Sequence, residues 1–130
     1  MKPRIVAIDD EAEFVDILKS YFAPRGYEID VAIRGPRGIE IVKEKLPDVV
    51  LMDLKMPGIN GDEVLKLLKS LEPAPKVIFI TAYDDGGKTK ARLLRLGAYA
   101  CFDKPIASLR ELEGAVNKAV SAPGAGGSHA

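Results

Sequence analysis

Short apolar runs alternate along the chain with longer segments in which apolar residues recur at helical spacing. The runs predict strands, and each is followed by a segment with the i, i+3, i+4, i+7 pattern of a core-facing helix. Five such alternations predict a repeated strand–helix unit and a parallel sheet covered by helices. The predicted strands span residues 4–8, 28–33, 49–52, 77–80 and 99–102.

The predicted helices have apolar stripes that we expect to face the core. These stripes consist of Phe14, Ile17, Leu18, Tyr21 and Phe22; Ile39, Val42 and Leu46, with Ile41 to one side; Val64, Leu67, Leu68 and Leu71; and Leu109, Leu112, Val116 and Val120. The fourth helix is weaker, because Gly86 and Gly87 fall in its expected first turn and each costs roughly 1 kcal/mol relative to alanine. We expect the segment from Asp84 to Gly97 to be mobile.

Helix starts are indicated by a capping residue with glutamate three positions later. Asn60 with Glu63 and Ser108 with Glu111 have this spacing, and so do Asp10 and Glu13. Taken alone, Asp10 would therefore be interpreted as a helix cap.

The run Val49-Val50-Leu51-Met52 is apolar throughout, which is typical of a strand covered on both faces. We predict an α/β fold, a doubly wound (βα)5 domain of flavodoxin-like type whose five-stranded parallel sheet has the order 2-1-3-4-5. The domain is predicted to span residues 1–120. Residues 121–130, SAPGAGGSHA, have the composition of a flexible tail or the start of a linker.

Composition narrows the function classes. The chain of 130 residues has 19 basic and 19 acidic side chains, so it has no global positive field for nucleic acid or an anionic membrane. Its single cysteine and single histidine, Cys101 and His129, are too few for a disulfide or a zinc site. With no signal-peptide pattern or membrane-spanning run, the expected location is the cytoplasm.

Polar residues follow the predicted strands at their carboxyl ends. Asp9 and Asp10 follow the first strand, Asp53 the third, Thr81 the fourth and Lys104 the fifth. In a parallel sheet these ends meet at one edge, so these residues are predicted to form one site. Neighbouring carboxylates raise one another's pKa, and a cation relieves that repulsion. Oxygen ligands with retained waters favour Mg²⁺, and the hydroxyl and the ammonium favour an incoming phosphoryl group.

Other phosphoryl and acyl-transfer sites are not supported by the sequence. It has neither a GxxxxGK[ST] nor a GxGxxG loop, and no serine–histidine or cysteine–histidine arrangement. The remaining candidate nucleophile is a carboxylate.

These residues also form a recognisable set of motifs. The set comprises Asp9-Asp10, Asp53 followed by Met56-Pro57-Gly58 and Gly61, Thr81-Ala82, and Gly97-Ala98 leading to Lys104-Pro105. Over about residues 3–120 the chain resembles the receiver domain of two-component response regulators. The resemblance implies that Asp53 accepts a phosphoryl group from a phosphohistidine on a sensor histidine kinase or phosphotransfer protein.

The resemblance also implies the other roles at the site. Asp10, Asp53 and the backbone carbonyl of Lys55 would bind Mg²⁺, and Asp9 would bind it mainly through water. Lys104 would pair with one phosphoryl oxygen, and Thr81 would move to hydrogen-bond another. The peptide bond before Pro105 would be cis.

The expected output is a change in the surface formed by the fourth helix, fifth strand and fifth helix. The family's switch position, usually aromatic, falls on Cys101, so the usual coupling to Thr81 is in doubt, and Phe102 is expected to pack in the core. Lys55 and Tyr83 lie two residues after Asp53 and Thr81, where the family tunes the phosphoryl lifetime.

Two other functions fit the sequence less well. A Mg²⁺-dependent phosphohydrolase with an aspartyl-phosphate is disfavoured because Asp53-Leu54-Lys55 lacks a second acid two residues on. A flavodoxin-like carrier is disfavoured by the absence of tryptophan and of a phosphate loop after the first strand. We therefore expect a signalling domain rather than an enzyme, with at most self-phosphorylation from small donors and self-dephosphorylation.

Partners are only partly indicated. An effector domain or protein downstream and a homodimer on phosphorylation are both left open. The basic stretch of Lys88, Lys90, Arg92 and Arg95 is interpreted as a solvated face, with docking of an acidic partner as the alternative.

Overall fold

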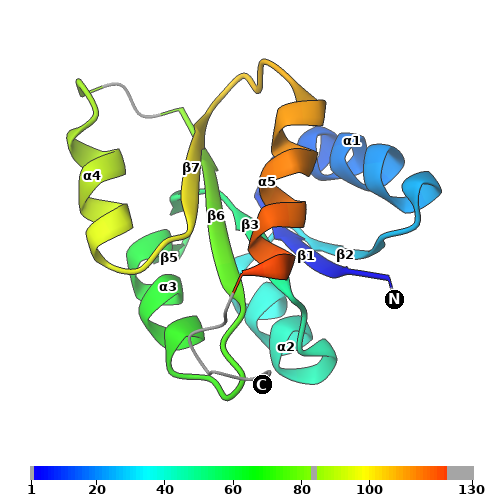
Figure 1. Cartoon of the computed structure of the whole chain (residues 1–130). Helices are drawn as coiled ribbons and strands as arrows, with labels where there is room; N and C mark the ends of the chain where they lie inside the picture. The colour runs from blue at the N-terminus through cyan, green and yellow to red at the C-terminus, as the bar shows by residue number, and fades with distance from the viewer. Residues whose placement is uncertain (1, 83–84, 123–130) are drawn as a thin grey trace.

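A computed structural model describes residues 2–82 and 85–122. Its centre is a parallel sheet of strands in the order β2-β1-β3-β6-β7 (Figure 1). The strands are β1 (Arg4–Ile8), β2 (Glu28–Ala32), β3 (Val49–Met52), β6 (Lys76–Thr81) and β7 (Ala100–Asp103). Counted along the sheet-forming strands, this is the predicted order 2-1-3-4-5, and the predicted α/β fold is confirmed.

Helices cover both faces of the sheet (Figure 1). One face packs against α1 (Ala12–Phe22) and α5 (Leu109–Ser121), and the other against α2 (Gly35–Lys45), α3 (Gly61–Lys69) and α4 (Lys88–Arg95). Alternate residues of a strand point to opposite faces. Val49 and Leu51 of β3 therefore join the first core and Val50 and Met52 the second, which explains why this strand is apolar throughout.

The segment between β3 and α3 contains a small hairpin that the sequence pattern did not predict. Strands β4 (Lys55–Met56) and β5 (Ile59–Asn60) pair antiparallel around Pro57 and Gly58, and Gly58 has a φ of 86°. This left-handed conformation favours glycine. The side chain of Asn60 accepts a hydrogen bond of 3.1 Å from the Glu63 N–H, so the predicted cap of α3 is confirmed.

Two other helix starts differ in outcome. The Ser108 hydroxyl accepts a hydrogen bond of 3.1 Å from the Glu111 N–H, which confirms the predicted start of α5. The cap interpretation of Asp10 is wrong, because Glu11 is the N-cap residue of α1 and the Glu11 N–H donates to Asp9 Oδ1 at 2.9 Å. Asp10 is therefore not used to start the helix.

The glycines before α4 also lie differently from the prediction. The helix begins at Lys88, and Gly87 is its N-cap residue with a φ of 87°. The two glycines thus precede the first turn and do not weaken it. The short 3-10 helix η1 (Ala23–Arg25) follows α1 and was not predicted.

The predicted apolar stripes of the helices agree only in part with the side chains that are buried. Ile17, Leu46, Leu67 and Val120 are exposed, whereas Val15, Ile41, Leu65 and Ala119 are buried. Leu46 lies at the end of α2 with a φ of 49°, outside the helical repeat. Ala119 and Gly38 are small enough to lie against the sheet, and a search for large apolar residues overlooks such positions.

The helix α5 continues through Ser121, the first residue of the predicted tail. The rest of that tail from 123 onward, including His129, lies outside the described residues, as do Tyr83 and Asp84. None of the described helices has both the length and the apolar character that a membrane crossing requires.

Candidate functional site

Three aspartates meet where β1 and β3 end. The Asp9 N–H donates to Ala32 at 3.0 Å and the Asp53 N–H donates to Ile8 at 3.1 Å, so backbone bonding continues one residue beyond each strand. Side-chain oxygens of Asp9, Asp10 and Asp53 all lie within 4.8 Å of one another. Asp9 and Asp53 are buried and Asp10 is exposed. Parallel pairing of β1 with β3 therefore brings together residues that are far apart in sequence.

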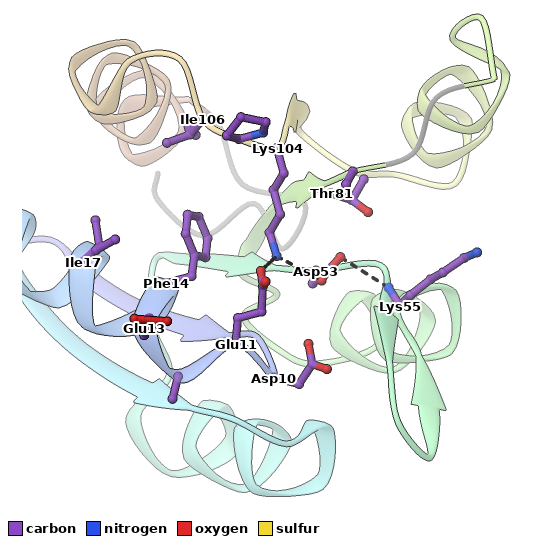
Figure 2. Close-up of a pocket in the computed structure, with 13 residues that line it drawn as sticks. Asp10, Glu11, Glu13, Phe14, Ile17, Asp53, Lys55, Thr81, Lys104 and Ile106 are labelled. Carbon is purple, nitrogen blue, oxygen red and sulfur yellow. Dashed lines mark hydrogen bonds and ion pairs between the residues drawn. The ribbon is translucent and has the colours of Figure 1, made fainter.

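Lys104 reaches this cluster from the loop after β7. Its Nζ lies 2.8 Å from Asp9 Oδ2 and 3.2 Å from Asp53 Oδ2. It also lies 2.6 Å from Glu11 Oε1 and 4.9 Å from the centre of the Phe14 ring (Figure 2). The ammonium is thus surrounded by three carboxylates and the face of one aromatic ring.

The acid–base properties of the cluster reflect this crowding. Burial raises the pKa of Asp9, and the hydrogen bonds and charge of Lys104 offset that rise only in part. Burial by itself lowers the pKa of Lys104, but the hydrogen bonds to Asp9 and Glu11 and the nearby negative charges outweigh it and raise the pKa well above its ordinary value. Lys104 is therefore held as an ammonium.

The residues present fit a divalent cation. Asp9 Oδ2 is buried and lies 2.8 Å from the Lys104 ammonium, which Asp9 shares with Glu11 and Asp53. With Asp9, Asp10, Glu11 and Asp53 around one lysine, the cluster keeps an excess of negative charge. An excess of hard carboxylate oxygens suits Mg²⁺ better than zinc, which prefers nitrogen and sulfur ligands.

The other predicted site residues lie around the same opening. The Lys55 N–H donates a long hydrogen bond of 3.4 Å to Asp53 Oδ1, and the Lys55 side chain points away from the cluster (Figure 2). Thr81 is buried at the end of β6. It lines the same opening as Asp53, and within the described residues its hydroxyl makes no hydrogen bond to Asp53.

An open cleft surrounds these groups. Its polar wall includes Asp10, Glu11 and Asp53, and its apolar wall is formed by Phe14, Ile17, Pro105 and Ile106. Sequence reasoning missed Glu11 and the contact of Phe14 with Lys104. Phe14 packs against the core as its apolar stripe predicts and also meets Lys104. The only signal for Glu11 in the sequence is that it directly follows Asp9-Asp10.

Cys101 and Phe102 lie on opposite faces of β7. Cys101 is partly buried against the core beneath α2, α3 and α4, and burial raises the pKa of its thiol. Phe102 is partly buried on the other face, against the core beneath α1 and α5. The peptide bond between Lys104 and Pro105 is cis, and so is the bond between Glu72 and Pro73.

Comparison with known proteins agrees with this geometry. A model of the response regulator receiver domain matches residues 5–117. Sporulation initiation phosphotransferase F of Bacillus subtilis is 34% identical over 118 residues, which cover 91% of this chain and 94% of the relative. Regulatory protein AtoC of Escherichia coli is 37% identical over 117 residues, which cover 90% of this chain and 25% of the relative. The chain thus spans about a quarter of AtoC.

The fold of the chain is also similar to solved structures of receiver domains. A response regulator receiver domain protein from Clostridium thermocellum has a TM-score of 0.82 and 29% identity, covering 91% of this chain and 94% of that one. The receiver domain of Francisella response regulator 1452 has a TM-score of 0.83 and 27% identity, covering 92% and 97%. These matches do not favour the phosphohydrolase alternative.

Proposed function

The chain belongs to the response regulator receiver domain family of two-component signalling, and from that premise we propose that Asp53 is its phosphoacceptor. One observation carries the proposal. The buried Asp53 carboxylate lies at the end of a central strand, 3.2 Å from Lys104 Nζ and within 4.8 Å of the Asp9 and Asp10 oxygens. A nucleophilic carboxylate thus sits beside a positive group that can hold a phosphoryl oxygen.

In the proposed reaction, an oxygen of Asp53 forms a bond to the phosphorus of a phosphohistidine. The bond from phosphorus to the imidazole nitrogen breaks, and its electron pair stays with that nitrogen. Such a transfer depends on positioning and charge neutralisation rather than on acid–base groups. Lys104 neutralises charge on a phosphoryl oxygen, and the fixed end of β3 positions the nucleophile.

Asp10, Asp53 and the carbonyl of Lys55 would bind Mg²⁺, with Asp9 contributing mainly through water. When bound, the cation neutralises phosphoryl oxygens that Lys104 alone cannot serve. The excess of carboxylates around one lysine supports this assignment.

The signal would spread through Thr81. Thr81 lines the cleft and would gain a hydrogen-bond acceptor when a phosphoryl group is added to Asp53, and such a differential contact favours one of two conformations. We expect the change to alter the surface of α4, β7 and α5. Cys101 at the switch position lacks the ring that usually couples to the threonine, so the movement would depend on Thr81 and the backbone of β7.

The proposed partners are a histidine kinase or phosphotransfer protein as donor and an effector domain or protein as receiver of the signal. A homodimer formed on phosphorylation is also proposed. Self-phosphorylation from a small donor and self-dephosphorylation are the expected activities of the isolated chain.

The proposal is tested by mixing the protein with Mg²⁺ and acetyl phosphate and measuring the intact mass. Wild type should gain one phosphoryl group, Asp53→Asn should gain none, and Asp16→Asn, an exposed change on α1, should behave as wild type. An unmodified wild type, or equal labelling of Asp53→Asn, would refute the assignment. Repeated turnover of an aryl phosphate would instead support a phosphohydrolase.

A further inference from the structure

Glu11 occupies a capping position but does not cap the helix. It is the N-cap residue of α1, yet its side chain makes no capping hydrogen bond. Instead its carboxylate turns toward the cleft and approaches Lys104 at 2.6 Å, the shortest of the three ion pairs that Lys104 makes (Figure 2). The side chain is therefore used for a contact with the site and not for the start of the helix.

The three carboxylates around Lys104 differ in exposure. The side chains of Asp9 and Asp53 are 3% and 12% exposed, whereas that of Glu11 is 62% exposed. Three carboxylates lie within 3.2 Å of one ammonium, which has only three N–H donors. A phosphoryl group on Asp53 brings additional acceptors to the same ammonium, and these compete with its present partners. Glu11 is the partner that leaves at least cost, because water can solvate its exposed carboxylate.

From this arrangement we infer that Glu11 is a positioning residue that holds the Lys104 ammonium in the unphosphorylated chain and releases it when Asp53 is phosphorylated. The inference rests on the proposed function of Asp53. Since the contact stabilises only the starting state, it opposes phosphorylation and leaves the phosphorylated state unaffected. Glu11 would thus set how readily the domain is phosphorylated without setting how long the phosphoryl group persists.

The test compares Glu11→Gln with Glu13→Gln. Glu13 is exposed, lines the same cleft and lies in the first turn of α1, but in the described structure it makes no contact with Lys104. Both variants remove one negative charge, so the difference between them isolates the contact. The rates of phosphorylation by acetyl phosphate and of dephosphorylation are measured at equal Mg²⁺ and ionic strength.

Glu11→Gln should be phosphorylated about two- to five-fold faster than Glu13→Gln, the range expected for an exposed ion pair. The dephosphorylation rates of the two variants should be equal. Equal or slower phosphorylation of Glu11→Gln, or a change in its dephosphorylation rate beyond that of Glu13→Gln, would overturn the inference while leaving Asp53 as acceptor. Failure of wild type to form any adduct would overturn the proposed function and this inference together.

Discussion

The backbone N–H of Lys104 donates a hydrogen bond of 3.1 Å to the carbonyl of Thr81. Thr81 is the last residue of β6 and Lys104 is the first residue after β7, and these two strands are paired. The hydrogen bond therefore fixes the backbone of the lysine against that of the threonine. The Lys104 ammonium can therefore change partners only by moving its side chain. Any shift of β6 or β7 would move Thr81 and the base of Lys104 together.

Replacement of Lys104 should destabilise the unliganded domain. Lys104→Met leaves the buried Asp9 carboxylate without its cation, and loss of one partner from such a pair leaves an uncompensated charge. We expect the free energy of unfolding at pH 7, measured in urea without divalent ions, to fall by about 1–3 kcal/mol. Lys88→Met, an exposed change on α4, should stay within about 0.5 kcal/mol of wild type. Equal stabilities of the two variants would contradict the prediction.

Mg²⁺ should stabilise the folded chain through the aspartate cluster. A ligand that binds only the folded state raises the free energy of unfolding by RT ln(1 + [L]/Kd), about 2.7 kcal/mol at a hundred-fold excess over Kd. Thermal unfolding with MgCl2, compared with NaCl at matched ionic strength, should show a rise in Tm for wild type. Asp10→Asn should lose most of this rise, whereas Asp16→Asn should keep it. A rise of the same size in Asp10→Asn would mean that the cation binds elsewhere.

Two glycines in helices should respond to alanine in opposite directions. A Cβ on Gly38 in α2 would lie 2.5 Å from Ile8 Cδ1 and 2.6 Å from Ile8 Cγ1, so the helix would have to move away from β1. Gly38→Ala should lower the free energy of unfolding by about 1–3 kcal/mol. A Cβ on Gly114 in α5 meets nothing within 4 Å, and Gly114→Ala should raise stability by about 0.5–1 kcal/mol.

The free energies of unfolding of Gly38→Ala and Gly114→Ala are measured in urea. The phosphorylation rate of each variant shows whether the site is also affected. Because Ile8 directly precedes Asp9, the shift caused by Gly38→Ala should also slow phosphorylation. An unchanged stability in Gly38→Ala would show that α2 can move from the sheet without cost.

Glu113 should make stability depend on pH. Its carboxylate accepts hydrogen bonds from the hydroxyls of Tyr21 at 2.7 Å and Tyr27 at 2.8 Å, linking α5 to α1 and to the segment before β2. These bonds, that from Tyr21 first, lower the pKa of Glu113 from its ordinary 4.5. A depressed folded-state pKa adds stability that is complete above 4.5 and is lost as the pH falls through the folded-state value.

Glu113→Gln should therefore lower the free energy of unfolding by about 1 kcal/mol at pH 7. The difference in stability from wild type should shrink as the pH drops below 4.5. Glu40→Gln, which removes only the exposed pair with Arg37, should cost less than about 0.5 kcal/mol at all these pH values. Urea titrations from pH 7 to acid conditions provide the measurement. A cost for Glu113→Gln that stays constant with pH would show that its charge is not involved.

The helix surfaces show where sequence reasoning became unreliable. Ile17 and Leu46 fit an apolar stripe but are exposed, whereas Ala119 is buried because it fits closely between α5 and the sheet. The pattern gives the period of a helix, but the rotation of the helix about its axis is decided by which residues pack against the strands. Small residues at close contacts carry no signal in a count of large apolar ones.

Some features of the site could be predicted from the sequence and others could not. Asp9, Asp53, Thr81 and Lys104 were predicted to converge from their places after apolar runs alone, because parallel strands present their carboxyl ends at one edge. The hairpin of β4 and β5 and the ion pair of Glu11 with Lys104 were not predicted. Both depend on where a second chain segment arrives, and this information is not local to either segment.

The order of apolar and polar residues along this chain is sufficient to predict its fold class and the convergence of Asp9, Asp10 and Asp53, because strand periodicity and parallel pairing are rules that act on short segments. Tertiary packing decides which carboxylates share the Lys104 ammonium, how far each is exposed and which face of β7 presents Cys101. The distances and solvation that govern charge interactions arise only after all the elements have packed together.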